Sequence, residues 1–404
     1  MSYPSSLWDI FCQVVDNHGD LGVCWRLSQH LLNLGQRVRL FIDQPEGLTW
    51  MAPHRHELEA QHQLTVLPWP NDLLWSNPSP NDWEKPQCVV EAFGCEIPQT
   101  YLARLCEPPK AQDPSLVGER SKPSWTWINL EYLSAEDYPE RMHQLPSPVM
   151  QGAAKGMTKW FFYPGFTPQT GGLLKRLEPT RADTTHNQSL KGSDSPDLIW
   201  NPQAQLKVFL FSYEPPALTG LLRQWLQLQT PTHLKVSFGR SHALVQSTLE
   251  STEFKPWVRH ESKRFKHMNL LTIEFIDALD HPQFDALLAS SDLNFVRGED
   301  SWIRAIWAQK AFIWQIYPQD DGVHLIKMNA FLKRFDAPES LQKVFRVWNG
   351  FETTPLPVLS PEEILVWTQW TQKLASHLDA MPDLSEQLCD FLALQQRESR
   401  PLLS

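Results

Sequence analysis

The chain has few cysteines, fewer basic than acidic residues, and no long apolar run. Its 404 residues contain six cysteines and no Cys-x-x-Cys pair, which excludes a disulfide framework and gives no zinc-ligand pattern. The 36 Lys and Arg stand against 46 Asp and Glu, a formal charge of −10, which disfavours a broad nucleic-acid-binding surface. No stretch approaches the roughly 18 apolar residues that a membrane-spanning helix needs.

The amino-terminal segment also lacks the features of a secretory signal peptide. Residues 1–15 contain Asp9 and no basic residue, whereas a signal peptide begins with a basic region. Together these absences predict a cytoplasmic protein that binds neither nucleic acid nor membrane and holds no metal.

Proline and tryptophan, in contrast, are abundant, with 33 and 18 copies. The hydrophobic share of 42% and the charged share of 20% are typical of a globular protein. The length predicts about two to three domains, at roughly 100–200 residues each. Many large rings in a loop-rich chain favour an architecture with pockets lined by aromatic side chains.

The first half of the chain reads as an α/β domain. An apolar run at 7–15, a polar loop at 16–22, a helical pattern at 23–34 and a second apolar run at 38–42 form a βαβ unit. Such a unit predicts a parallel sheet. Further strands are expected at 64–67, 88–93 and 125–132.

The composition changes at residues 167–205, which are polar and nearly free of apolar residues in the middle. This segment is interpreted as a linker with a polar insert. It divides the chain into an N-terminal domain at 1–166 and a C-terminal domain at 206–375, followed by a helical segment at 376–404 that is expected to pack back on the first domain. Two α/β halves joined in this way place a ligand cleft between them.

The loop at 16–22 carries two carboxylates, Asp16 and Asp20, four residues apart beside a predicted helix start. It follows the first strand, at the edge where parallel sheets bind ligands, but it lacks the Gly-x-Gly-x-x-Gly pattern of a dinucleotide site. Asp20 therefore has two interpretations, a functional carboxylate or a helix N-cap.

A second strand–glycine–helix sequence lies at 294–302. Arg297 offers a guanidinium suited to phosphate oxygens, next to the N–H groups of a helix start. The alternative is that Asp300 and Ser301 only cap that helix. Near the end of another strand, Phe211 and Tyr213 alternate onto one side, where a base could stack on them, although core packing also explains them.

Five segments together resemble one known family. Residues 11–27, 127–134, 161–166, 294–302 and 314–319 are similar to motifs of the bacterial protein-arginine rhamnosyltransferases that mature elongation factor P, the EarP family. The resemblance spans nearly the whole chain apart from the insert. It implies a glycosyltransferase-B fold, with two Rossmann-like domains that face a central cleft.

The resemblance also implies an activity. Enzymes of this family transfer L-rhamnose, with inversion, from dTDP-β-L-rhamnose to an arginine side chain of elongation factor P, without a metal or other cofactor. The N-terminal domain would then be the acceptor side, and the C-terminal domain would bind the nucleotide sugar. Two alternatives stay open: a glycosyltransferase with a small-molecule acceptor, and a nucleotide-sugar-binding protein without catalysis.

The same resemblance assigns roles to individual residues. It implies Asp20 as the catalytic aspartate, supported by Asp16 and by Glu299. His281 stands where the family usually has a glutamine. The implied donor-binding residues are Asn17, His18, Gly19, Phe211, Tyr213, His281, Arg297, Gly298, Glu299, Asp300 and Ser301.

Overall fold

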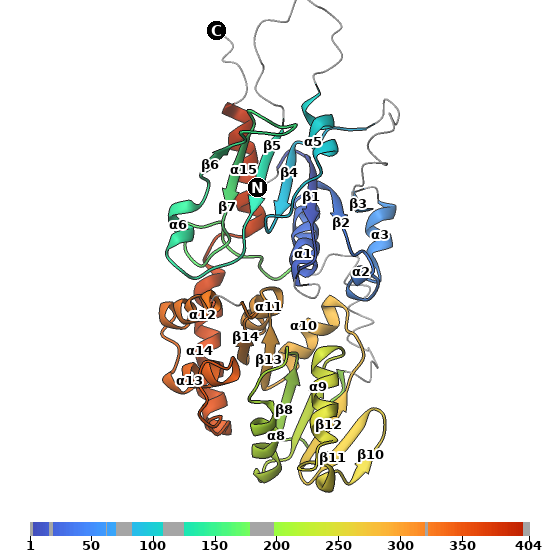
Figure 1. Ribbon diagram of the computed structural model, residues 1–404, viewed down its shortest axis with the longest axis vertical. Helices are drawn as coiled ribbons and strands as arrows, with labels where there is room; N and C mark the ends of the chain where they lie inside the picture. The colour runs from blue at the N-terminus through green and yellow to red at the C-terminus, as the bar shows by residue number, and fades with distance from the viewer. Residues whose placement is uncertain are drawn as a thin grey trace, which may run out of the picture. The chain divides into compact units, whose positions relative to one another are not determined.

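The computed structural model describes residues 3–15, 19–61, 63–69, 83–107, 125–177, 198–319 and 322–398. The chain divides into two compact units. The N-terminal unit comprises residues 1–49, 53–177 and 381–404, and the C-terminal unit comprises residues 50–52 and 178–380. Each unit contains a seven-stranded, mainly parallel sheet accompanied by helices (Figure 1). This confirms the predicted α/β class.

The sheet of the N-terminal unit has the strand order β3-β2-β1-β4-β5-β7-β6, and only the β6–β7 pairing is antiparallel. Its strands are β1 (Leu7–Cys12), β2 (Arg37–Ile42), β3 (Leu64–Pro68), β4 (Cys88–Ala92), β5 (Thr126–Leu130), β6 (Pro146–Pro148) and β7 (Thr158–Phe162). Its helices are α1 (Gly19–Asn33), α2 (Gly47–Met51), α3 (Arg55–Ala60), α5 (Gln99–Cys106), α6 (Tyr138–Met142) and α15 (Leu384–Glu398).

The first strand and helix differ from their predicted bounds. Strand β1 is buried along its whole length but ends at Cys12, and α1 begins at Gly19, so Asp20 lies inside the helix. An acidic residue in the first turn is favourable because it faces the positive end of the helix dipole. Within β1, the buried carboxylate of Asp9 accepts two hydrogen bonds from Arg39, at 2.6 and 2.7 Å, and a third from the Tyr101 hydroxyl.

The last helix of the chain completes the N-terminal unit. Figure 1 shows α15, in red, beside β7, and the centroid of the Phe391 ring lies 5.4 Å from that of the Trp160 ring. The N-terminal unit also extends past residue 166, because Leu173 and Leu174 are buried and Leu173 bridges to Asp383. Residues 178–197, which include most of the predicted polar insert, lie outside the described part of the chain.

The sheet of the C-terminal unit has the order β10-β11-β12-β9-β8-β13-β14. Strands β10 and β11 form an antiparallel hairpin edge, and the remaining pairings run parallel except for β11–β12. The strands are β8 (Leu206–Leu210), β9 (Thr232–Val236), β10 (His260–Glu261), β11 (Phe265–Met268), β12 (Leu271–Phe275), β13 (Leu293–Arg297) and β14 (Ala311–Gln315). The helices are α8 (Leu218–Gln227), α9 (Arg240–Leu249), α10 (His281–Ser290), α11 (Asp300–Ala308), α12 (Val323–Arg334), α13 (Glu339–Trp348) and α14 (Pro361–Asp379), with a short 3₁₀ helix at Lys255–Trp257.

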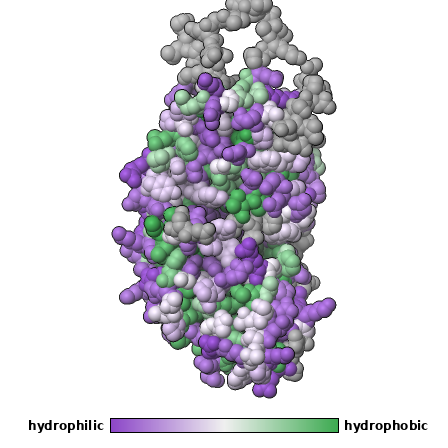
Figure 2. All heavy atoms as spheres, in the orientation of Figure 1, coloured by the Kyte–Doolittle hydropathy of each residue, from purple (hydrophilic) through white to green (hydrophobic). Residues whose placement is uncertain are grey.

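Tryptophan rings contribute to the cores of both units, where Trp8, Trp225, Trp302, Trp314, Trp348 and Trp367 are fully buried. Trp302 and Trp314 stack with ring centroids 3.8 Å apart, next to the strand–glycine–helix segment of the C-terminal unit. The space-filling view shows a largely hydrophilic face on which hydrophobic residues form scattered patches (Figure 2). Across the described ranges, no helix combines the length and hydrophobicity needed to cross a membrane.

Candidate functional site

Asp20 lies in the first turn of α1, at the edge of the N-terminal sheet where the parallel strands end. It is only 4% exposed, and its Oδ2 accepts a hydrogen bond from the backbone N–H of Val15 at 2.9 Å. The neighbouring N–H of Val14 donates to Asp43 at 3.0 Å. Because Asp20 is inside the helix and accepts from a residue before it, the N-cap interpretation is wrong. Asp16, Asn17 and His18 lie outside the described residues.

Two further carboxylates, for which the sequence analysis predicts no role, lie at the same edge. Both carboxylate oxygens of Glu91, on β4, accept hydrogen bonds from the Lys159 ammonium at 2.9 Å. Glu131 follows β5, and its carboxylate accepts a hydrogen bond from the Asn129 side chain at 2.5 Å. Burial raises the pKa of each, against the lowering effect of these hydrogen bonds. A glutamate directly after a buried strand was the available signal for Glu131.

A strained backbone lies next to these carboxylates. Phe93, the residue after β4, has a φ of 58°, a left-handed conformation that a side chain rarely adopts. Its ring stacks on Tyr132 with centroids 4.6 Å apart. Strain of this kind costs about 1–3 kcal/mol and concentrates at functional sites. The ligand edge of the N-terminal sheet thus combines buried acids with an ordered aromatic pair.

In the C-terminal unit, Arg297 is the last residue of β13 and lies against two aromatic rings. Its guanidinium carbon is 4.5 Å from the centroid of Phe211 and 4.7 Å from that of Tyr213. Strand β8 ends at Leu210, so both aromatic residues lie beyond it. Their position on one side therefore does not come from the alternation of side chains along a strand, as the sequence analysis assumed. The structure thus brings these three of the predicted donor-site residues together, with the guanidinium over the two rings.

The turn after Arg297 is fixed by hydrogen bonds on both sides. The Ser301 hydroxyl accepts from the backbone N–H of Arg297 at 3.1 Å and donates to its carbonyl. The indole N–H of Trp314 donates to the carbonyl of Gly298 at 2.7 Å, and Gly298 adopts a left-handed φ of 63°. The N-cap position of α11 is Glu299, so Ser301 binds the loop and the capping interpretation of Asp300 and Ser301 is wrong.

Glu299 immediately precedes α11 and forms an ion pair with Lys327 on α12. Its Oε1 lies 2.5 Å from the Lys327 Nζ, and both side chains are largely buried, at 19% and 16% exposed. A charge pair at this depth is screened much less than one on the surface. Lys327 was not singled out by the sequence, because nothing in its local pattern distinguishes it from the other lysines.

His281 and Asp300 are the first residues of α10 and α11. Asp280, before His281, caps α10 by accepting from the backbone N–H of Gln283 at 2.8 Å. The His281 carbonyl accepts from Arg304 at 2.6 Å, and the Asp300 carboxylate accepts from Arg304 at 3.2 Å. The structure thus gives these two predicted donor-site residues a shared partner.

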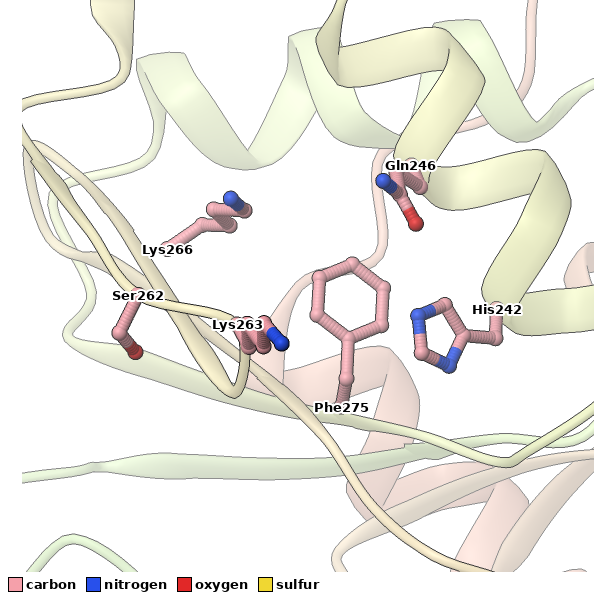
Figure 3. A pocket seen from close by; sticks show the side chains of 6 residues that line it. All are labelled: His242, Gln246, Ser262, Lys263, Lys266 and Phe275. Carbon is pink, nitrogen blue, oxygen red and sulfur yellow. The ribbon is translucent and has the colours of Figure 1, made fainter.

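A separate pocket of about 580 Å³ opens in the C-terminal unit between α9 and the β10–β11 hairpin (Figure 3). In it the His242 and Phe275 rings stack with centroids 4.4 Å apart. None of the predicted site residues lines this pocket. Its lining residues are His242, Gln246, Ser262, Lys263, Lys266 and Phe275.

The arrangement around Arg297 suits an anion. A guanidinium and the N–H groups at the start of α11 both favour negative charge at the end of β13. Within the described ranges, no three His, Cys, Asp or Glu side chains gather in a way that could hold a metal ion. That the reaction proceeds without a metal stays a prediction.

The two Rossmann-like units have the fold of the glycosyltransferase-B type. The family model described as elongation factor P rhamnosyltransferase EarP matches residues 8–393. The chain therefore belongs to this family and is a glycosyltransferase. This confirms the family that the sequence motifs indicated.

Individual relatives agree with the family match. The chain is 36% identical to a protein-arginine rhamnosyltransferase of Pseudomonas putida, over 85% of this chain and 86% of the relative. It is 32% identical to the protein-arginine rhamnosyltransferase of Pseudomonas aeruginosa, over 96% of this chain and 98% of that one. A solved structure concerning EarP-mediated arginine glycosylation of translation elongation factor EF-P has a similar fold, with a TM-score of 0.57 at 23% identity, covering 96% and 99% of the two chains.

Proposed function

We propose that this enzyme transfers L-rhamnose from dTDP-β-L-rhamnose to an arginine side chain of elongation factor P, with inversion at the anomeric carbon. The observation that carries the proposal is the family match over residues 8–393. Because the acceptor is a translation factor, the proposal also places the enzyme in the cytoplasm.

The donor is assigned to the C-terminal unit. Its diphosphate carries negative charge, and this charge increases on the leaving dTDP as the sugar departs. Arg297 and the N–H groups at the start of α11 supply donors for that charge. Because those groups are already positioned, the proposal needs no metal. Gly298, Asp300, Ser301 and Glu299 shape this loop, and Phe211 and Tyr213 hold the guanidinium of Arg297.

The acceptor chemistry is assigned to the N-terminal unit. An arginine guanidinium has a pKa above about 12, so its nitrogen lone pairs are unavailable until a proton leaves. In the proposed step a nitrogen–carbon bond forms at the anomeric carbon while the carbon–oxygen bond to the diphosphate breaks. Asp20 accepts the proton that the guanidinium loses. Asp16 holds the guanidinium, and attack from the face opposite the leaving group inverts the configuration.

Asp20 has features that suit this role. The Val15 N–H fixes one of its oxygens, which orients the carboxylate. The first turn of α1 favours its ionised form through the helix dipole.

The test is incubation of the purified enzyme with dTDP-L-rhamnose and elongation factor P, followed by intact-mass measurement of the acceptor. We expect the addition of one deoxyhexosyl group to elongation factor P, and no addition when the enzyme is omitted. Donor hydrolysis without a mass change on elongation factor P would contradict the protein acceptor and would favour a small-molecule acceptor. Donor binding without consumption would indicate a non-catalytic binding protein. The anomeric configuration of the product, measured by NMR on the modified protein, tests inversion.

A further inference from the structure

Arg304 is a buried cation in the second turn of α11, and neither the sequence motifs nor the proposed mechanism uses it. Its side chain is only 5% exposed. Burying a guanidinium is costly unless its donors are all matched by well-placed acceptors. The acceptors around such a residue fix its position, and the residue in turn fixes the positions of those acceptors.

The acceptors of Arg304 come from two different helix starts. Its Nε donates to Asp285 Oδ1 at 2.7 Å and its Nη2 to the His281 carbonyl at 2.6 Å, both in the first turns of α10. Its Nη1 donates to Asp300 Oδ2 at 3.2 Å, at the start of α11. One planar, rigid group thus joins the N-terminal ends of two helices that lie at the ligand edge of the sheet.

Arg304 also supports a stack of rings that ends at Arg297. Its guanidinium carbon lies 4.5 Å from the centroid of the Phe284 ring. Phe284 contacts Phe211 edge to face, with centroids 5.4 Å apart, and Phe211 lies beneath Arg297 at 4.5 Å. The order along this line is cation, ring, ring, cation, and each member limits the movement of the next.

The charges around Arg304 are consistent with this arrangement. Burial lowers its pKa, but the carboxylates of Asp285 and Asp300 outweigh burial and raise the pKa above its ordinary value. Arg304 therefore stays protonated at any pH at which the protein is folded.

We propose that Arg304 is a positioning residue for the nucleotide-sugar donor. It fixes the Asp300 carboxylate and the first turn of α10 relative to the loop at 297–301. Through its contact with Phe284, it also limits the movement of the Phe211 ring that lies under Arg297. The inference rests on the proposed function, because it assumes that this loop binds the donor. It assigns to Arg304 an effect on donor affinity without any contact to the substrate.

The test compares Arg304→Met with a control that removes a buried cation elsewhere in the same unit. Lys235→Met is suitable, since Lys235 is fully buried and its Nζ lies 2.6 Å from Glu274 on β12. Melting temperature and the Kd for dTDP by calorimetry are measured for both variants, at a temperature where each is folded. We expect both variants to lose stability, but only Arg304→Met to weaken dTDP binding, by about ten-fold or more.

Steady-state kinetics provide a second readout. A positioning role predicts a raised KM for the donor with a kcat that changes much less, and partial recovery in Arg304→Lys, which keeps the charge but not the three-way fork. If Arg304→Met does not fold, Asp285→Ala removes one of the three contacts, and a smaller rise in KM is expected. Asp285 is 54% exposed, so this substitution disturbs the core little.

The outcomes separate this inference from the proposed function. Wild-type enzyme that does not bind dTDP or dTDP-rhamnose would overturn the proposed function. Wild-type enzyme that binds dTDP, with Arg304→Met binding it equally well, would overturn the positioning role alone. An equal loss of affinity in Lys235→Met would also overturn it, because the effect would then follow stability rather than position.

Discussion

The Lys327 Nζ lies 2.5 Å from Glu299 Oε1, and this contact joins α12 to the residue immediately before α11. It holds a carboxylate next to the loop that carries Arg297, with both partners mostly removed from solvent. Glu299 is thereby fixed in place before any ligand arrives. A residue far along the chain from the glycine loop thus determines where one of the proposed site carboxylates points.

Replacing Lys327 with methionine should lower activity while the protein stays folded. The substitution keeps the apolar stem but removes the ammonium, so Glu299 loses this ion pair and the constraint that it places on the carboxylate. We expect kcat/KM for the donor to fall by about ten-fold. Lys343→Met, on the exposed face of α13, is the matched control and should retain full activity. Equal activity in the two variants would show that the ion pair contributes only to packing.

Replacing Asp20 with asparagine should separate proton acceptance from structure. Asparagine keeps an oxygen that can accept the Val15 N–H, so folding and donor affinity should be close to those of the wild type. Turnover should fall by about 10²-fold or more, because the proton acceptor is lost. Asp20→Ala also removes the hydrogen bond and should cost about 1 kcal/mol of unfolding free energy in addition.

Rhamnosylation rates and melting temperatures of both Asp20 variants provide the measurement. An Asp20→Asn enzyme that turns over at the wild-type rate would show that Asp20 is not the base. Asp16 and Glu299 would then be the carboxylates to test next.

The sequence predicted the class of fold well, because the spacing and the number of apolar residues specify strands and helices locally. It correctly indicated a βαβ start, a second α/β half, and a strand–glycine–helix turn at 293–302. It placed the start of α1 too late, since Gly19, Asp20 and Gly22 are typical loop residues and only the tertiary structure shows that they are helical. The strand β14 and the hairpin β10–β11 were not predicted.

The candidate site was predictable only where its residues are adjacent in the sequence. Arg297, Glu299 and Ser301 are a few residues apart and form one pattern. Lys327 meets Glu299, and Arg304 meets His281 and Asp285, through the packing of different helices, which no local pattern encodes. The position of the Arg297 guanidinium over Phe211 and Tyr213 likewise depends on the pairing of β8 with β13.

Removing Arg297 should weaken donor binding. Arg297→Ala deletes a cation that is held over two rings at the ligand edge, so the diphosphate loses a charge-assisted partner. We expect the Kd for dTDP-rhamnose, measured by calorimetry, to rise by about ten-fold or more. Arg223→Ala serves as the control, because Arg223 is an exposed residue of α8 paired with Glu253. An unchanged Kd in Arg297→Ala would exclude Arg297 from the diphosphate site.

Chelation should leave activity unchanged. The proposed mechanism neutralises the diphosphate with Arg297 and the start of α11, and it assigns no step to a cation. Rhamnosylation by enzyme treated with excess EDTA and then desalted should therefore proceed at the untreated rate. A loss of activity that magnesium restores would show that the donor site requires a divalent ion.

Acid should destabilise the C-terminal unit through Glu274. Burial raises the pKa of Glu274, but hydrogen bonds from His233, Lys235 and Arg264 outweigh burial and lower the pKa to about 2. Because the folded-state value is depressed, this stabilisation is present above the ordinary value of about 4.5 and is lost as the pH falls towards 2. The unfolding free energy should therefore decline across that window.

The measurement is denaturant unfolding of wild type and Glu274→Gln between about pH 6 and 3. The variant should be less stable near pH 6 and should lose less stability on acidification. Glu253→Gln is the control, because the pKa of Glu253 is also lowered, by Arg223, but at a fully exposed position where solvent screens the pair. Parallel pH dependences in wild type and Glu274→Gln would contradict the assignment.

The placement of α15 in the N-terminal unit has a consequence for synthesis on the ribosome. The residues of the C-terminal unit after 177 form one continuous segment, whereas the N-terminal unit needs residues 381–404, which are translated last. Until then Phe391 is missing from its contacts with Trp160 and Phe162, and Asp383 from its contact with His30. The unit that emerges first is therefore completed last, and a stalled or prematurely terminated chain would expose the face of β7 that α15 covers to chaperones and proteases.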